Sequence, residues 1–224
     1  GRPSSITKRL KRLLDVTLAA SGLVAASPFL LLIAVLIRVR MGNPVLYRQV
    51  RPGLHGDPFT LVKFRTMRHP RAGEAEVGNA RARVTRLGSF LRRTSLDEVP
   101  ELWNVIRGDM SIVGPRPLLT EFLQYYTPEQ ARRHDVLPGM TGWAQIHGRR
   151  DVQMQERIAL DVWYVDNWSL RLDAKSILAT LRQILSGSSE SEPVKSVPFD
   201  QLGWSGPEEA FGEPAARAES EERA

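Results

Sequence analysis

The longest apolar segment of the chain spans residues 16–37 and contains no charged side chain. At a rise of ~1.5 Å per residue, a straight helix over this segment is about 33 Å long, which is enough to cross the hydrocarbon core of a membrane. Basic residues flank the segment on both sides. Since basic flanks prefer the cytoplasmic side of a membrane, the pattern predicts a membrane helix with both ends on that side.

The dipeptide Ser27-Pro28 lies near the middle of this apolar segment. Proline removes one helix hydrogen bond and bends the chain, and the serine hydroxyl can pair with the carbonyl that loses its donor. A helix that enters the membrane, breaks at Ser27-Pro28 and returns to the same face agrees with the proline and with the flanking charges. A kinked helix that crosses the membrane is the alternative, and the residues alone leave both open.

Beyond the membrane helix, the pattern of apolar positions changes and predicts a helix-rich α+β body. Two β-like runs, at 45–47 and 59–67, are separated by turn residues and predict a hairpin. Residues 161–164 are interpreted as an ordinary helical segment. We expect the amphipathic helices to lie at the membrane interface. The predicted helices are 87–93, 96–106, 118–126, 128–136, 152–167 and 174–185.

The net charge of +6 combines two regions of opposite sign. Residues 186–224 carry nine acids and three bases, and residues 1–185 therefore carry a surplus of twelve positive charges. The tail is rich in Ser, Pro, Gly and Glu without a helical period, so we expect disorder, with a short docking motif as the alternative. The chain then divides into a basic N-terminus with its membrane helix at 1–40, a body at 41–185 and an acidic tail at 186–224.

The residue types that the chain lacks exclude several kinds of catalysis and metal binding. The chain has no cysteine, which excludes disulfides, thiol catalysis and cysteine-ligated zinc. The four histidines show no metal-ligand spacing, and the sequence lacks the Gly-rich phosphate-binding fingerprints. The basic surplus is typical of proteins that bind anionic lipid, nucleic acid or phosphorylated substrates. Covalent catalysis in this chain would therefore fall to a carboxylate.

The densest group of candidate catalytic residues is the segment RRTSLDEVP at 92–100. In one interpretation, Ser95 and Glu98 form a capping box at a helix N-terminus. In the other, Asp97 is a nucleophile that attacks phosphorus, and Glu98 is a metal ligand or proton acceptor. Arg92 would then offset the charge of the phosphate. The spacing alone leaves both interpretations open.

Two further groups of residues are candidates for substrate binding. Pro115 and Pro117 flank Arg116 and make a rigid loop around it. Lys63 and Arg65 lie two positions apart in a predicted strand, so their side chains are expected on the same face.

Several of these segments together resemble the bacterial sugar transferases. These are monotopic phosphoglycosyl transferases, which start glycan assembly on polyprenyl phosphate. The resemblance extends over about 8–185, and its motifs occur in the family's order. The matching segments are KRLLDVTLA, the Ser27-Pro28 break, KFRTM at 63–67, LRRTSLDEVPELWNVIRGDMSIVGPRP at 91–117 and PGMTGWAQIHGR at 138–149.

The resemblance implies an enzyme that transfers a sugar-1-phosphate from a UDP-sugar to undecaprenyl phosphate and releases UMP. It implies a ping-pong reaction through Asp97, with Mg²⁺ held by Asp97 and Glu98. It also implies that Arg92 binds phosphate and that Arg116 belongs to a nucleotide loop. The helix broken at Ser27-Pro28 is then re-entrant in the bacterial inner membrane, and the body at 41–185 is a catalytic domain that faces the cytoplasm.

The competing hypothesis is a non-catalytic basic adaptor that binds anionic lipid and recruits partners through its acidic tail. It explains the charges and the apolar segment but gives no reason for the Asp97-Glu98 pair or the Pro-Arg-Pro loop. A nucleic-acid partner is not expected, because the sequence lacks the combination of aromatic and basic residues that is typical of base stacking.

Overall fold

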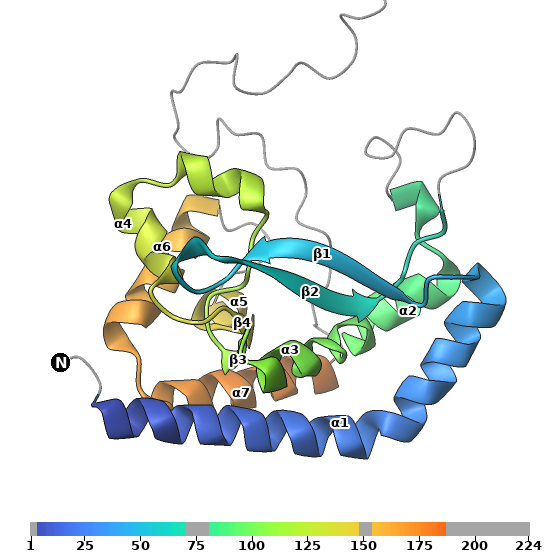
Figure 1. The fold of residues 1–224 in the computed structure, drawn as a ribbon, viewed down its shortest axis with the longest axis horizontal. Helices are drawn as coiled ribbons and strands as arrows, with labels where there is room; N and C mark the ends of the chain where they lie inside the picture. Colours follow the sequence, from blue (N-terminus) through green and yellow to red (C-terminus); the bar gives the residue numbers. More distant parts are fainter. Residues whose placement is uncertain (1–3, 70–80, 148–153, 187–224) are drawn as a thin grey trace, which may run out of the picture.

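The computed structural model of the chain describes residues 4–69, 81–147 and 154–186 (Figure 1). Helices dominate this part, and two small two-stranded sheets lie among them, so the prediction of a helix-rich α+β fold is confirmed. The predicted tail, from 187 onward, lies outside the described residues, as does the start of the helix predicted at 152.

The N-terminal helix α1, Ser5–Met41, contains the whole apolar segment and bends part-way along its length (Figure 1). Pro28 lies inside the helix and has no N–H to donate to the carbonyl of Val24. The Ser27 hydroxyl donates to that carbonyl instead, at 2.8 Å. The predicted break at Ser27-Pro28 is therefore a bend, because the helix continues on both sides of the proline.

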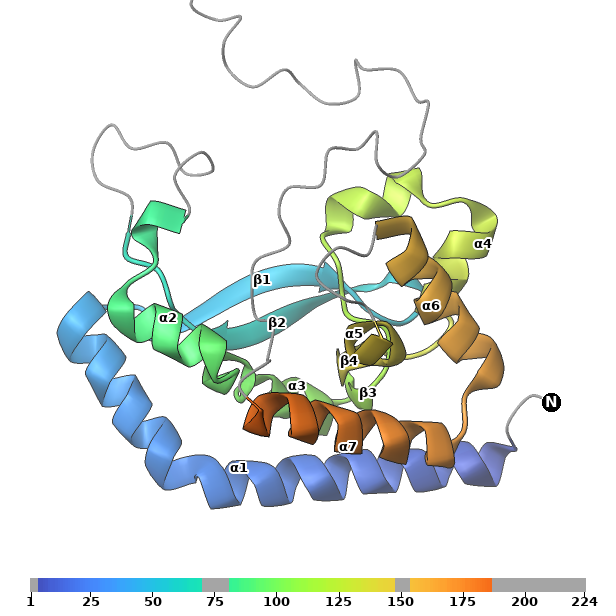
Figure 2. The same ribbon diagram turned by 180° about the vertical axis from the view of Figure 1, so that it is seen from behind.

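Both arms of α1 pack against the same body (Figure 2). On the first arm, Ala19 is fully buried in a cluster with Val105. On the second arm, Ile37 is buried in a cluster with Phe64 and Leu91. The bend lets one long helix follow the surface of the body instead of leaving it.

The predicted hairpin is present, with β1 at Leu46–Pro52 and β2 at Pro58–Phe64 paired antiparallel around the turn η1, Leu54–Gly56. The chain then returns through η2, Arg81–Arg83, to helix α2, Arg86–Arg93. Gly88 lets α2 lie directly on the chain after β2, since a Cβ atom there would stand 1.9 Å from the carbonyl oxygen of Thr66. This close contact brings the end of α2 next to the hairpin.

Three of the predicted helices are shorter or more irregular than expected. The helix predicted at 96–106 is divided by Val99-Pro100 into the turn η3, Leu96–Glu98, and the helix α3, Glu101–Arg107. The segments at 118–126 and 128–136 form η4, Thr120–Tyr125, α4, Pro128–Ala131, and η5, Arg132–His134. Proline at positions 100 and 128 cannot donate a helix hydrogen bond, which favours these short turns.

A second sheet was not predicted. Strands β3, Ser111–Val113, and β4, Gly139–Thr141, pair in parallel, and α5, Trp143–His147, follows β4. Each strand has only three residues, which is too short for an alternating pattern to reveal it. The sheet matters because the Pro-Arg-Pro loop begins directly after β3.

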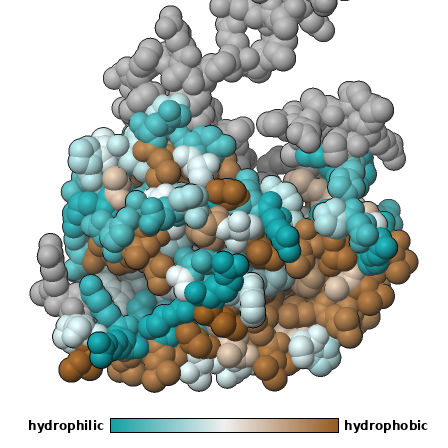
Figure 3. Space-filling view, viewed as in Figure 1, coloured by the Kyte–Doolittle hydropathy of each residue, from teal (hydrophilic) through white to brown (hydrophobic). Residues whose placement is uncertain are grey.

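The C-terminal helices are α6, Met154–Asn167, and α7, Leu170–Leu185, and α7 runs beside the first arm of α1 in both views (Figures 1 and 2). Figure 3 shows hydrophobic side chains gathered along α1. Within the described residues, α1 is the one helix long and apolar enough to cross a membrane, and only 11% of its most apolar window is buried. Exposed apolar side chains of α1 and α7 include Leu13, Val24, Phe29, Leu31, Val35, Val39, Leu178, Leu181 and Leu185.

Candidate active site

A strained turn between α2 and α3 places Asp97. The backbone of Ser95 has φ +55°, a left-handed conformation that costs a non-glycine residue about 1–2 kcal/mol. Its side chain makes no capping hydrogen bond within the part of the chain that the structure describes, so the capping-box interpretation is wrong. The turn directs Asp97 into the protein, where only 3% of the residue is exposed.

Asp97 is a buried carboxylate that is incompletely paired. Its Oδ1 atom is buried and accepts no hydrogen bond from any described residue. Burial and the neighbouring Glu98 raise the pKa of Asp97, while the positive charges of Lys63 and Arg92 act to lower it. The cations thus favour the ionised form, and one oxygen remains available for a ligand or for reaction.

Glu98 and Arg116 form an ion pair between the turn after α2 and the Pro-Arg-Pro loop. Nη2 of Arg116 donates to Oε1 of Glu98, and Nη1 lies 3.4 Å from Oε2. Burial alone would raise the pKa of Glu98, but the charge and hydrogen bonds of Arg116, together with the charge of Lys63, hold that pKa below its ordinary value. The Arg116 side chain is still 38% exposed. It can therefore hold Glu98 and also contact a ligand from solvent.

Lys63 and Arg92 complete the predicted cluster around Asp97. Lys63 projects from β2, and the charges of Asp97, Glu98 and Arg116 all act on it. Arg92 comes from the last turn of α2, and its Nε donates to the Thr66 hydroxyl at 2.9 Å. The structure thus brings side chains from β2, α2, η3 and the Pro-Arg-Pro loop to one place.

Arg65 does not join this cluster. Its guanidinium donates to the carbonyls of Met41 and Gly42, both at 2.6 Å, and to the carbonyl of Asn43 at 2.9 Å. These carbonyls belong to the end of α1 and the residues after it. Arg65 therefore ties the second arm of α1 to the end of the hairpin, although the alternating pattern placed it beside Lys63.

A small cavity of about 40 Å³ beside this cluster adds two residues that the sequence analysis did not select. Glu101 is buried, and burial together with the charge of Glu98 raises its pKa to about 8. The Nε of Arg51 is buried and pairs with none of the described residues. Glu101 follows Glu98 by three positions, and this helical spacing could have identified Glu101 as a member of the site from the sequence. The cavity is lined by Arg51, Leu61, Lys63, Glu101, Arg116 and Pro117.

The carboxylates suit a magnesium ion that is completed by a substrate. No cluster of three His, Cys, Asp or Glu side chains that could hold a metal ion occurs within 4–69, 81–147 and 154–186. Mg²⁺ is commonly held by one or two carboxylates together with substrate phosphates. Asp97 offers its Oδ1, which has no hydrogen-bond partner in the described part of the chain, and the Glu98 oxygens retain lone pairs beside Arg116. This donor set fits Mg²⁺ bound with a diphosphate.

Comparison with known proteins agrees with the motifs. Residues 6–187 match the family described as bacterial sugar transferase. The chain is 50% identical over 176 residues to an uncharacterized sugar transferase, EpsL, of Bacillus subtilis, covering 79% of this chain and 87% of that protein. It is 45% identical to a UDP-glucose:undecaprenyl-phosphate glucose-1-phosphate transferase of Caulobacter vibrioides, covering 79% of this chain and 70% of that protein.

An Escherichia coli protein of the same name is 39% identical, over 80% of this chain but only 40% of its own length. These names confirm the prediction of a phosphoglycosyl transferase enzyme, and the chain belongs to the bacterial sugar transferase family.

Proposed function

We propose that this chain transfers a sugar-1-phosphate from a UDP-sugar to undecaprenyl phosphate, releases UMP and so initiates a bacterial glycan. The observation that carries the proposal is Asp97, a buried carboxylate under the influence of Lys63 and Arg92, with one oxygen that pairs with no residue that the structure describes. The names of the Caulobacter and Escherichia relatives supply the two substrates, UDP-glucose and undecaprenyl phosphate.

In the first step, a carboxylate oxygen of Asp97 attacks the phosphorus that carries the sugar. The bond from this phosphorus to the bridging oxygen breaks, and UMP leaves with the bonding electrons. The sugar phosphate remains on Asp97 as an acyl phosphate. Lys63 and Arg92 act against the upward shift of the Asp97 pKa and so favour the ionised carboxylate that attacks, and Arg116 offsets charge on the departing nucleotide.

In the second step, a phosphate oxygen of undecaprenyl phosphate attacks the same phosphorus. The bond between phosphorus and Asp97 breaks, which restores the carboxylate and yields the sugar on undecaprenyl diphosphate. Mg²⁺, when bound by Asp97 and Glu98, would neutralise part of the donor's diphosphate charge. Glu98 also keeps Arg116 oriented through their ion pair.

The same proposal places α1 in the inner membrane as a re-entrant helix inserted from the cytoplasmic face, with the domain at 41–185 in the cytoplasm. A straight helix of 37 residues would separate its ends by about 55 Å. Both ends of α1 are instead bonded to the body, through Arg12 to the carbonyl of Val105 at 2.6 Å and through Arg65 to the carbonyl of Met41 at 2.6 Å. Ends that share one body favour one side of the membrane.

The proposal is tested by measuring UMP release from purified protein in lipid nanodiscs with UDP-glucose, undecaprenyl phosphate and Mg²⁺. Asp97→Asn should stop the release, whereas Asp57→Asn, which changes an exposed carboxylate in the hairpin turn, should not. The expected result is UMP formation that requires undecaprenyl phosphate for multiple turnovers. A wild-type protein that releases no UMP from any of a panel of UDP-sugars would favour the adaptor hypothesis instead.

A further inference from the structure

The loop 114–117, which carries Arg116, is held at its start by residues from distant parts of the chain. The carbonyl of Val113 accepts hydrogen bonds from Nζ of Lys11 at 3.2 Å and from the hydroxyl of Tyr164 at 3.1 Å. Lys11 belongs to the first arm of α1 and Tyr164 to α6. The last residue before the loop is therefore held by the membrane helix and by a helix of the body.

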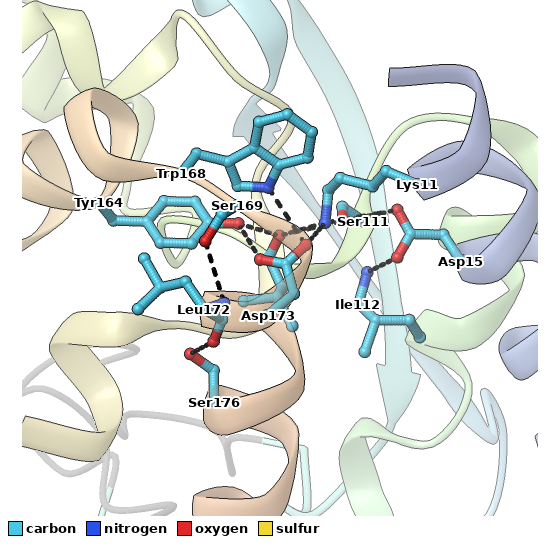
Figure 4. Close-up of polar contacts among 11 residues, drawn as sticks. Lys11, Asp15, Ser111, Ile112, Tyr164, Trp168, Ser169, Leu172, Asp173 and Ser176 are labelled. Atoms are coloured by element: carbon cyan, nitrogen blue, oxygen red, sulfur yellow. Dashed lines mark hydrogen bonds and ion pairs between the residues drawn. The ribbon is translucent and has the colours of Figure 1, made fainter. Parts of the chain in front are cut away.

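The same two donors meet at one carboxylate. Figure 4 shows Lys11, Tyr164 and Trp168 directed toward Asp173 of α7. Asp173 accepts from Lys11 at 2.6 Å and from the Trp168 indole at 3.1 Å, and the Tyr164 hydroxyl shares its one proton between Asp173 at 2.7 Å and the Val113 carbonyl at 3.1 Å. Burial and the charge of Asp173 raise the pKa of Tyr164, so its hydroxyl stays protonated and can donate. Buried charges are tolerated when they are paired in this way, and such pairing favours a single arrangement of α1, α6 and α7.

The far end of the loop is held from η5, by an arginine that is itself paired with α6. Arg133 is fully buried, pairs with Asp161 at 2.7 Å and donates to the carbonyl of Arg116 at 2.7 Å. The segment 161–164 is thus more than the ordinary helical segment expected from the sequence, since Asp161 and Tyr164 act at opposite ends of the loop. With both ends held, the direction of the Arg116 side chain depends on these contacts.

We propose that Lys11 and Tyr164 are positioning residues for Arg116, which they direct through the carbonyl of Val113. The first arm of α1 then has a second role beside anchoring, because it holds the loop that faces the nucleotide. The inference rests on the proposed function, in which Arg116 contacts the UDP-sugar. It predicts that changes at Lys11 weaken donor binding while the protein remains on the membrane.

The test compares four variants in nanodiscs, with the KM for UDP-glucose and kcat measured by UMP release and membrane association by sedimentation. Tyr164→Phe keeps the ring and the Lys11–Asp173 pair and removes only the hydroxyl, and Lys11→Met removes the donor from α1. Both should raise KM about tenfold and change kcat by less than about threefold. Lys11→Arg should recover most of the loss. The matched control is Lys8→Met, which removes an exposed charge from the same helix and should leave KM unchanged.

Unchanged KM values in Tyr164→Phe and Lys11→Met, beside a fully active wild type, would overturn the inference alone. A fall in kcat with unchanged KM would also overturn it, because a general structural defect gives that result. If Lys11→Met does not fold, Tyr164→Phe decides the question. A wild type that releases no UMP would overturn the proposed function, and this inference with it.

Discussion

Two buried carboxylates in this chain are used in opposite ways. Asp173 is 7% exposed, and both of its oxygens accept hydrogen bonds, from Lys11, Tyr164 and Trp168. Asp97 is 3% exposed, yet its Oδ1 has no partner among the described residues. Burial is therefore nearly the same at the two sites, and the number of partners differs. Complete pairing is what a structural carboxylate needs, while an unpaired oxygen is what a nucleophile needs.

The largest effect is expected for Asp97→Asn. The amide cannot form an acyl phosphate, so UMP release should fall about 10⁴-fold. Thermal stability should stay the same or rise slightly, because the change removes a buried and incompletely paired charge. UMP release and thermal unfolding of the same preparation check both parts. If the variant kept a tenth of the wild-type activity, Asp97 would not be the nucleophile, and the proposed difference in role between Asp97 and Asp173 would be wrong.

Asp173→Asn should show the reverse behaviour. It leaves the part-buried Lys11 charge with an incomplete set of partners and should lower the free energy of unfolding by about 3 kcal/mol. Chemical denaturation in detergent micelles measures this loss. The matched control, Asp166→Asn, changes a carboxylate whose side chain is 47% exposed and should have little effect. Equal stability of the two variants would contradict a structural role for the Asp173 network.

Glu101→Gln is expected to change how stability depends on pH. A pKa raised from 4.5 to about 8 means that the folded protein keeps a proton that the unfolded chain releases between these values. Wild-type stability should therefore fall as pH rises through this window. The variant has no carboxyl group to ionise at this position, so it should be more stable than wild type at pH 9, with a smaller difference at pH 5. Unfolding curves at both pH values decide this, and parallel pH dependences would refute it.

The smallest of these effects is expected for Lys63→Met. Lys63 acts to lower the pKa of Asp97, so its removal should move the acidic limb of the pH–rate profile upward by about one pH unit. The profile of kcat/KM for UMP release provides the measurement. Lys175→Met, an exposed lysine on α7, is the control and should leave the limb in place. A limb that does not move would mean that Lys63 has no part in ionising Asp97.

The parts of the molecule that the sequence predicted are local in the chain. The apolar segment, the hairpin and the Asp97-Glu98 pair each lie within a short stretch, so periodicity and motif were sufficient. The Ser27 hydroxyl could be predicted to satisfy a freed carbonyl because a proline removes the donor to a known position, here Val24.

The features of the molecule that the sequence did not predict depend on contacts between positions that are far apart in the chain. Lys11 and Asp173 are 162 positions apart, and no local pattern connects them. Arg65 follows the alternation of β2, but the strand ends at Phe64, so Arg65 turns toward the end of α1. The role of Tyr164 could not be predicted from the sequence, because a tyrosine in an amphipathic helix has the same pattern as any core residue.

The central claim is that Asp97 carries the sugar phosphate between the two steps, and intact-mass measurement tests it most directly. The wild-type protein is mixed with UDP-glucose and Mg²⁺ without undecaprenyl phosphate, quenched and analysed before and after addition of the lipid. We predict that the intact protein gains the mass of one hexose phosphate, with one equivalent of UMP released, and loses this mass when undecaprenyl phosphate is added. Asp97→Asn should acquire no such mass. A wild-type enzyme that turns over with both substrates but gains no mass and releases no UMP without the lipid would contradict the claim.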